Sequence, residues 1–207
     1  MSRSRIQANR WVLLMGLLGC VVLAGGTVTA ARAADSGKHE LQLTAFAVNL
    51  GVTPDLRSPR PATAIVEIAI DRWSTEAERD ELIATLRTKG QDGLLKALQE
   101  NPSVGTIRTP DTLAWDLHFA RQTPTADGGR RIFLATNRRI SFWEAAHLPR
   151  SIHYPFTLIE IHLDKNGHGE GKMSIATKIE ISKDGKEIQL EDYATQPARL
   201  QDVHETR

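Results

Sequence analysis

Cysteine is nearly absent from this sequence, because Cys20 is the only one among 207 residues. A single thiol cannot form an internal disulfide, and it cannot build a zinc site from several thiolates. The sequence also lacks the Gly-x-Ser-x-Gly pattern of many hydrolases, a phosphate loop, the dinucleotide-binding glycines and the paired histidines of metalloproteases. Since none of these motifs occurs, no chemistry is specified, and we expect neither a cofactor nor a metal.

A large excess of one charge is missing too. The chain has 26 basic and 25 acidic residues, a formal net charge of +1. Residues 1–33 hold four of the arginines and no acidic residue, so the rest of the chain has 22 basic and 25 acidic residues and a net charge of −3. A net-basic surface for nucleic acid is therefore not indicated.

The N-terminus has the features of an export signal. Arg3, Arg5 and Arg10 precede an apolar run that begins at Trp11, and Ala31-Arg32-Ala33 places small residues where a signal peptidase cleaves. The signal segment is also the only part that we expect to meet a membrane. The predicted organisation is a signal peptide at 1–33, a short tether at 34–40 and a single domain at 41–207.

Two alternatives to cleavage stay open. The run from Trp11 to Ala31 is long enough for an uncleaved membrane anchor. The segment Leu17-Leu18-Gly19-Cys20 approximates an acylation site, which would make the protein a lipoprotein anchored at Cys20. Apolar residues continue after Cys20, however, where a lipoprotein tether turns polar.

Alternating apolar and polar residues predict strands from Ile159 to Leu163 and from Met173 to Ile181. A two-residue turn at Asn166-Gly167 would set a charge opposite each apolar residue of the first strand, which the pleat of a sheet disfavours. We therefore expect an odd loop of about three to five residues. The expected partners are Met173 for Leu163 and Ile175 for Ile161.

The next turn is easier to assign. Asp184-Gly185 tolerates the positive φ that a tight hairpin requires. Closing the chain there sets Ile181 opposite Ile188 and Ile179 opposite Leu190. Apolar residues then meet apolar residues on one face of the sheet.

Two helices are expected between Thr75 and Pro102. Thr75 and Glu78 have the spacing of a capping box, and Gly90 is placed to end the first helix. The second helix ends before Pro102. We expect the helices to cover one sheet face completely, so that any binding site lies elsewhere. The expected contact joins Leu82, Leu86, Leu94 and Leu98 to Ile159, Ile161, Met173, Ile175, Ile179 and Leu190.

Leu113, Trp115, Leu117 and Phe119 alternate with more polar residues, which predicts one strand with an aromatic-rich buried face. Short connections between successive strands indicate antiparallel pairing. The sequence therefore predicts an α+β fold. It consists of a mainly antiparallel sheet of about eight strands, curled or partly closed into a barrel, with a two-helix insertion.

The segment from Gly129 to Gly171 contains an arginine pair, a Leu-Ala-Thr element, a Phe-Trp-Glu element and the strand sequence Tyr-Pro-Phe-Thr-Leu. In these elements it resembles a group of uncharacterised exported bacterial proteins. The resemblance covers only this part of the chain. It implies an origin in the bacterial envelope, and it implies no activity.

Five residues are candidates for ligand binding. Phe142 and Trp143 lie in a connection, where aromatic side chains either plug the open end of a sheet or line the mouth of a ligand site. Arg131 and Arg138 belong to two arginine pairs that bracket one strand, and each pair presents one guanidinium on each side of the sheet. His147 completes the set, to which we assign no catalytic residue.

Five histidines and one glycine-rich loop contain residue types that can bind metal ions. The spacings of His118, His147, His153, His162 and His168 match no ligand pair of a zinc site. Asp164 to Gly169 looks like the opening of an EF-hand, but His168 replaces an oxygen ligand and Ile175 stands where a bidentate glutamate is needed. A polar hairpin turn explains the same residues.

An export signal without a catalytic motif favours a non-enzymatic protein of the periplasm or the exterior that binds a small ligand or a protein partner. The alternative is an enzyme that uses Glu144, His147 and His153 near Trp143 for acid–base chemistry. A lined cavity without converging titratable groups would favour binding, and a histidine and a carboxylate in one cleft would favour catalysis.

The export signal makes a testable prediction. The mature protein should begin at Ala34 or within a residue of it, because the small residues Ala31 and Ala33 mark the cleavage site. N-terminal sequencing of protein from the envelope fraction checks this. A mature N-terminus at a lipid-modified Cys20 would contradict it.

Overall fold

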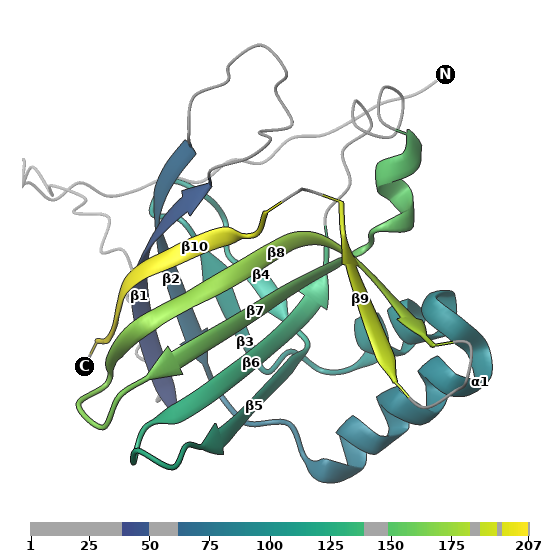
Figure 1. Ribbon diagram of the computed structural model, residues 1–207, viewed down its shortest axis with the longest axis horizontal. Helices are drawn as coiled ribbons and strands as arrows, with labels where there is room; N and C mark the ends of the chain where they lie inside the picture. Colours follow the sequence, from purple (N-terminus) through teal and green to yellow (C-terminus); the bar gives the residue numbers. More distant parts are fainter. Residues whose placement is uncertain (1–38, 50–61, 139–148, 183–186, 194–195, 207) are drawn as a thin grey trace, which may run out of the picture. The chain divides into compact units, whose positions relative to one another are not determined.

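The computed structural model describes residues 39–49, 62–138, 149–182, 187–193 and 196–206 (Figure 1). The predicted signal peptide, the Asp184-Gly185 turn and the segment that holds Phe142, Trp143 and His147 lie outside these ranges. Within them, no helix has both the length and the apolar character needed to cross a membrane.

Within the described ranges, ten strands form one sheet in which all neighbours are antiparallel. The order is β4-β3-β2-β1-β10-β8-β7-β6-β5, and β9 also pairs with β8. One α-helix, α1 (Glu76–Glu100), and a short 3-10 helix, η1 (Pro149–His153), accompany the sheet. The strands are β1 (Leu41–Asn49), β2 (Ala62–Ile70), β3 (Gly105–Arg108), β4 (Trp115–Leu117), β5 (Phe119–Pro124), β6 (Arg130–Asn137), β7 (Phe156–Leu163), β8 (His168–Ile181), β9 (Ile188–Asp192) and β10 (Ala198–Glu205).

The sheet curls until its two ends meet. β4 and β5 stand at opposite ends of the strand order, yet only His118 separates them in the chain. The His118 amide donates to the Ala135 carbonyl of β6 (3.1 Å), and the Thr136 hydroxyl donates to the Asp116 carbonyl (2.6 Å). The result is a nearly closed barrel. The predicted antiparallel sheet and partial closure are confirmed, with ten strands in place of about eight.

Each strand near α1 has one face inside the barrel and one outside. On β6, Ile132 and Leu134 belong to the interior core, whereas Phe133 and Ala135 lie on the outer face. α1 packs on that outer face. The predicted contact surface is therefore largely wrong, because Ile159 and Ile161 point into the barrel. The residues that α1 covers are Phe119, Ala135, Phe156, Leu158 and Ile179.

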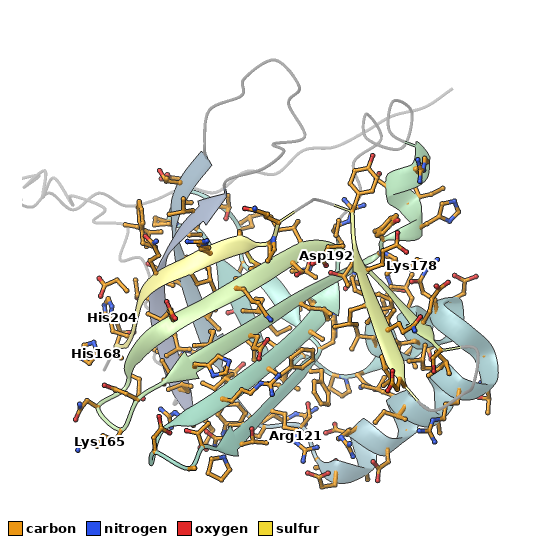
Figure 2. The ribbon with its side chains drawn as sticks, in the orientation of Figure 1. Arg121, Lys165, His168, Lys178, Asp192 and His204 are labelled. Atoms are coloured by element: carbon orange, nitrogen blue, oxygen red, sulfur yellow. The ribbon has the colours of Figure 1, made fainter. Side chains whose placement is uncertain are left out.

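The β7–β8 hairpin has the predicted odd spacing, because five residues, with Lys165 among them (Figure 2), separate the register partners Leu163 and Gly169. Its register nevertheless differs from the prediction. Leu163 pairs with Gly169 and Ile161 with Gly171, not with Met173 and Ile175. A Cβ at Gly169 would lie 1.8 Å from the carbonyl oxygen of His162, so the backbones approach too closely there for a larger residue. The apolar residues of β7 thus face glycines.

Ile175 is not a core residue. On β7 only Thr157 lies between Phe156 and Leu158, whereas on β8 Ile175 and Ala176 lie between their partners Thr177 and Ser174, so β8 bulges there. The side chain of Ile175 in this bulge is 44% exposed. Its predicted place under the helices is wrong, because the bulge turns it outward.

The register of the β8–β9 hairpin is confirmed. Ile181 pairs with Ile188 and Ile179 with Leu190, as the Asp-Gly turn predicts. The predicted burial is only half right, however. Ile179 is buried, whereas Leu190 is 57% exposed and Ile188 is 45% exposed.

The predicted single strand from Leu113 to Arg121 is two strands, β4 and β5. Leu117 lies in the interior core and Phe119 packs on the outer face, although both have the same parity in the sequence. Leu113 is 89% exposed. The aromatic-rich buried face is therefore wrong, since the chain passes from one end of the strand order to the other at His118.

α1 begins with the predicted capping box. The Glu78 amide donates to the Thr75 hydroxyl (3.2 Å), and the Thr75 amide donates to the Glu78 carboxylate (2.7 Å). Both Arg72 guanidinium nitrogens also bind that carboxylate, at 2.9 and 3.1 Å. The two predicted helices are two segments of α1 that meet at a kink at Gly90. Gly90 has φ 67° and ψ −163°, which kinks α1 without ending it.

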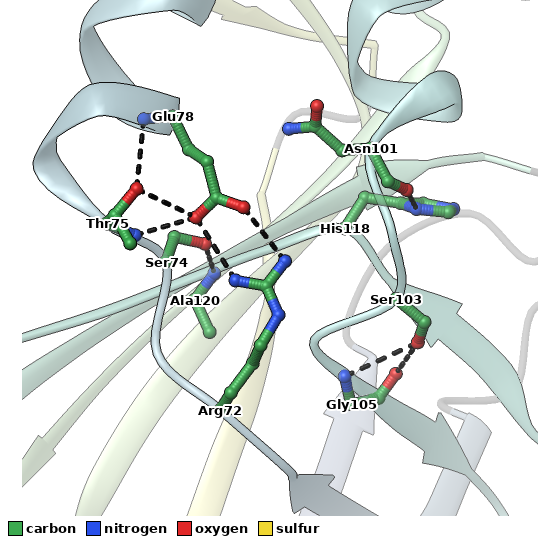
Figure 3. A network of polar contacts seen from close by, with 9 residues as sticks. All are labelled: Arg72, Ser74, Thr75, Glu78, Asn101, Ser103, Gly105, His118 and Ala120. Carbon is green, nitrogen blue, oxygen red and sulfur yellow. Dashed lines mark hydrogen bonds and ion pairs between the residues drawn. The ribbon is translucent and has the colours of Figure 1, made fainter.

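Both ends of α1 are attached to the corner between β4 and β5 (Figure 3). Before the helix, the Ser74 amide donates to the Ala120 carbonyl (2.8 Å), and the Ala120 amide donates to the Ser74 hydroxyl (3.1 Å). After the helix, Nδ1 of His118 lies 2.9 Å from the carbonyl oxygen of Asn101. The corner that closes the barrel therefore also places α1 along the outer face.

We expect Ile161→Ala and Ile175→Ala to differ strongly in stability. Ile161 is fully buried, so its truncation should lower the free energy of unfolding by about 2–5 kcal/mol. Ile175→Ala should cost less than about 1 kcal/mol, because much of that side chain is already in water. Urea denaturation of both variants measures the difference. Equal losses would contradict the bulge in β8.

The cap of α1 should make stability depend on pH in the acid range. Hydrogen bonds from Arg72 and from the Thr75 backbone lower the pKa of Glu78 from 4.5 to about 2. Because the folded-state pKa is the lower one, the stabilisation is fully present above pH 4.5 and is lost as the pH falls towards 2. At neutral pH it should amount to about 1–3 kcal/mol for this partly exposed carboxylate.

Urea midpoints of the wild type and Glu78→Gln measure this contribution. The wild type should be the more stable protein at pH 7, and the gap should shrink between pH 4.5 and 2.5. Glu81→Gln, at an exposed α1 position outside the cap, is the control. A gap for Glu78→Gln that stays constant over this range would contradict the assigned pKa.

Candidate functional site

An apolar groove of about 560 Å³ lies between α1 and the outer face of the sheet, and we call it the outer groove. One wall comes from α1 and the floor comes from β5 to β8. β9 supplies the remaining wall through Ile188 and Leu190. The apolar lining consists of Leu82, Ile83, Leu86, Leu94, Leu98, Phe119, Phe133, Ala135, Phe156, Leu158, Ile179, Ile188 and Leu190.

The groove follows from how α1 is attached. Its ends are fixed at Ser74 and Asn101, so the helix lies beside β5 and β6 and its apolar stripe faces the sheet. β9 pairs with the last residues of β8 and stands beyond the end of β10 (Figure 1). All five β9 residues are exposed, which leaves Ile188 and Leu190 on an open wall of the groove.

Three arginines line the same groove, and the carboxylates that they bind do not. Arg121 on β5 makes a bidentate ion pair with Glu76, with nitrogen–oxygen distances of 3.0 and 3.1 Å. Arg79 on α1 binds Asp80 at 2.9 Å and lies 3.8 Å from the Glu76 carboxylate. Arg131 on β6 binds Glu160 through Nε at 2.7 Å. We call Arg79, Arg121 and Arg131 the arginine rim; Arg121 is labelled in Figure 2.

Glu160 joins the rim to Lys172 and His162 on the outer sheet face. Its carboxylate binds Lys172 at 2.8 Å and His162 at 3.1 Å, in addition to Arg131. Burial alone would raise the pKa of Glu160, but the hydrogen bonds from Lys172 and His162 and the charges of Lys172 and Arg131 together lower it. The carboxylate is therefore charged, and Lys172 shares in neutralising it.

A second, polar recess of about 600 Å³ lies beside the kink at Gly90. Two side-chain pairs lie within the recess. The Tyr154 hydroxyl donates to Glu191 (2.5 Å), which raises the pKa of Tyr154, and Lys178 binds Glu180 at 2.7 Å. The first bond ties the residue that follows η1 to β9, and the second lies within β8, so both have a structural role.

Two of the predicted ligand-binding residues, Arg131 and Arg138, are described by the structure, and one of these two lines the outer groove. Arg131 lines it, whereas Arg138 donates to the carbonyls of Ser151 (2.8 Å) and Tyr154 (2.9 Å) and so fixes η1. The other three candidates, Phe142, Trp143 and His147, lie outside the described residues. The expected complete cover of one sheet face by the helices is not found, because the outer groove lies between α1 and the sheet.

Sequence reasoning missed Arg79, Arg121 and the β9 wall. A signal for Arg121 exists, since it has the parity of Phe119 and thus brings a charge to an otherwise apolar outer face. Nothing in the sequence indicates that Leu190 is exposed, because its register partner Ile179 is buried.

The predicted metal alternatives gain no support. In the part of the chain that the structure describes, no group of three or more His, Cys, Asp or Glu side chains could hold a metal ion. Asp164 is used for the hairpin turn. Its Oδ1 accepts the amides of His168 (2.9 Å) and Asn166 (2.8 Å), and these bonds lower the pKa of the Asp164 carboxyl.

Comparisons with protein-family models, with curated proteins and with solved structures find no match for this chain. The proposed function therefore rests on the geometry of the outer groove.

Proposed function

We propose that this protein is an exported, non-enzymatic binding protein that holds a small apolar ligand in the outer groove. The observation that carries the proposal is the wall formed by Ile188 and Leu190, whose side chains are exposed yet continuous with a groove of buried apolar residues. Covering such a wall removes apolar surface from water, which favours binding by about 25 cal/mol per Å².

The size and lining of the groove support a small ligand. Ligand sites in proteins commonly have volumes of about 300–1,000 Å³ and are mostly apolar with a few polar groups. At about 560 Å³, the groove has thirteen apolar lining residues, with Thr123 and the arginine rim as its polar groups.

The same lining supports binding over catalysis. Among the described residues that line the groove, the titratable side chains are all arginines, which stay protonated in proteins and do not act as general bases. The alternative, acid–base chemistry by Glu144, His147 and His153 near Trp143, gains no support from His153. Its side chain has no carboxylate partner within the described residues.

Export is supported by the arginines and apolar run of residues 1–33. A soluble carrier outside the cytoplasm has a simple physical use, since apolar molecules partition out of water. A protein partner that seats an apolar segment on Ile188 and Leu190 is the competing occupant, and a small-molecule probe separates the two.

A neutral fluorescent probe, N-phenyl-1-naphthylamine, should bind the wild type saturably with one site. Leu190→Asp should weaken that binding at least tenfold, because a carboxylate on the groove wall must stay hydrated. The matched control is Ile65→Asp. Ile65 is 48% exposed on the outer face of β2 and does not line the groove, so probe binding should be unchanged.

Fluorescence titration of the wild type, Leu190→Asp and Ile65→Asp tests whether the probe binds in the outer groove. Absence of saturable binding to the wild type would contradict a small-ligand site. So would equal weakening by both substitutions, since the effect would then not come from the outer groove.

A further inference from the structure

We propose that the ligand is an anionic amphiphile, a linear aliphatic carboxylate, whose head group binds the arginine rim while its tail lies in the outer groove. The inference rests on the proposed function and adds the chemical class of the ligand. It is carried by three guanidinium groups on an apolar groove, whose lining includes no acidic side chain among the residues that the structure describes.

The arginine rim gathers on one part of the groove from three elements. In the β5–β6 register, Arg121 pairs with Phe133 and Thr123 pairs with Arg131, so the two arginines are diagonal neighbours on the outer face. Such neighbours lie about 7–8 Å apart, within reach of long side chains. Arg79 comes from the beginning of α1 and shares the carboxylate of Glu76 with Arg121.

Glu76 shows that the arginine rim can bind a carboxylate. Its carboxylate is bound bidentately by Arg121 and lies 3.8 Å from Arg79, which is the geometry in which guanidinium groups recognise carboxylates. The Glu76 side chain is nevertheless mostly exposed. An exposed ion pair of this kind contributes little stability, so a ligand carboxylate can displace it at low cost.

The local charge balance favours an anion. The three arginines of the rim pair with three carboxylates, those of Glu76, Asp80 and Glu160. Lys172, which binds Glu160 from outside the groove, adds one positive charge in excess. Next to the rim, Phe133 begins the apolar floor that continues to Ile179 and the β9 wall. A molecule with one negative end and one aliphatic end matches both parts.

The test compares three ligands with the same twelve-carbon tail, namely dodecanoate, dodecanol and dodecyltrimethylammonium, by displacement of N-phenyl-1-naphthylamine below their micelle concentrations. Dodecanoate should bind at least tenfold more tightly than dodecanol, and the cation should bind most weakly. The preference for dodecanoate should fall as sodium chloride is raised, because salt screens the rim.

Single substitutions test whether the arginine rim causes the preference for dodecanoate over dodecanol. Arg121→Gln should reduce dodecanoate binding to the level of dodecanol while leaving probe binding intact, which also shows that the variant is folded. Glu76→Gln should tighten dodecanoate binding, because it removes the competing carboxylate. Arg108→Gln, which breaks an ion pair with Glu67 on β2 and β3 away from the groove, should change neither ligand.

The outcomes separate the inference from the proposed function. Equal affinity for dodecanoate and dodecanol, or a preference unchanged in Arg121→Gln, would overturn the anionic head group and leave the apolar site standing. Failure of the probe and all three ligands to bind would overturn both. Binding to phosphatidylglycerol vesicles without binding to free dodecanoate would also overturn the inference, in favour of a membrane surface.

Discussion

The hydrogen bonds at the corner between β4 and β5 are the constraint on which the rest of the structure depends. Only His118 separates these strands in the chain, yet they stand at opposite ends of the sheet, so the sheet must curl to satisfy the backbone there. The His118 amide donates to Ala135, while its ring and the backbone of Ala120 hold the two ends of α1. One corner therefore closes the barrel and places the helix.

The placement of α1 divides the apolar residues into two sets with different roles. The interior set, which includes Leu134 and Ile161, is covered by the barrel itself and accounts for most of its stability. The outer set is covered only in part, since α1 shields one side and β9 leaves Ile188 and Leu190 in water. An incompletely covered apolar surface beside fixed charges is the physical basis of a ligand site.

The sequence predicted local features well, because turns and caps depend on a few neighbouring residues. The Asp184-Gly185 pair determined the β8–β9 register, and Thr75 with Glu78 identified the start of α1. Features that depend on distant pairing were not predictable. Alternation continues through His118 although the chain changes faces there, and Arg121 reaches the site only because barrel closure brings β5 beside α1. Arg131 was predictable as a site residue because its arginine pair lies at the end of a strand.

The central claim is that ligands bind outside the barrel, under α1, and not in its interior. A methyl NMR titration with dodecanoate tests it most directly, because the two apolar sets carry distinct leucine and isoleucine methyl groups. We expect the shifts to concentrate in the outer set: Leu82, Leu86, Leu94, Leu98, Leu158, Ile179, Ile188 and Leu190. Shifts concentrated in the interior set of Leu43, Ile68, Leu134 and Ile161, with the outer set unmoved, would contradict the account.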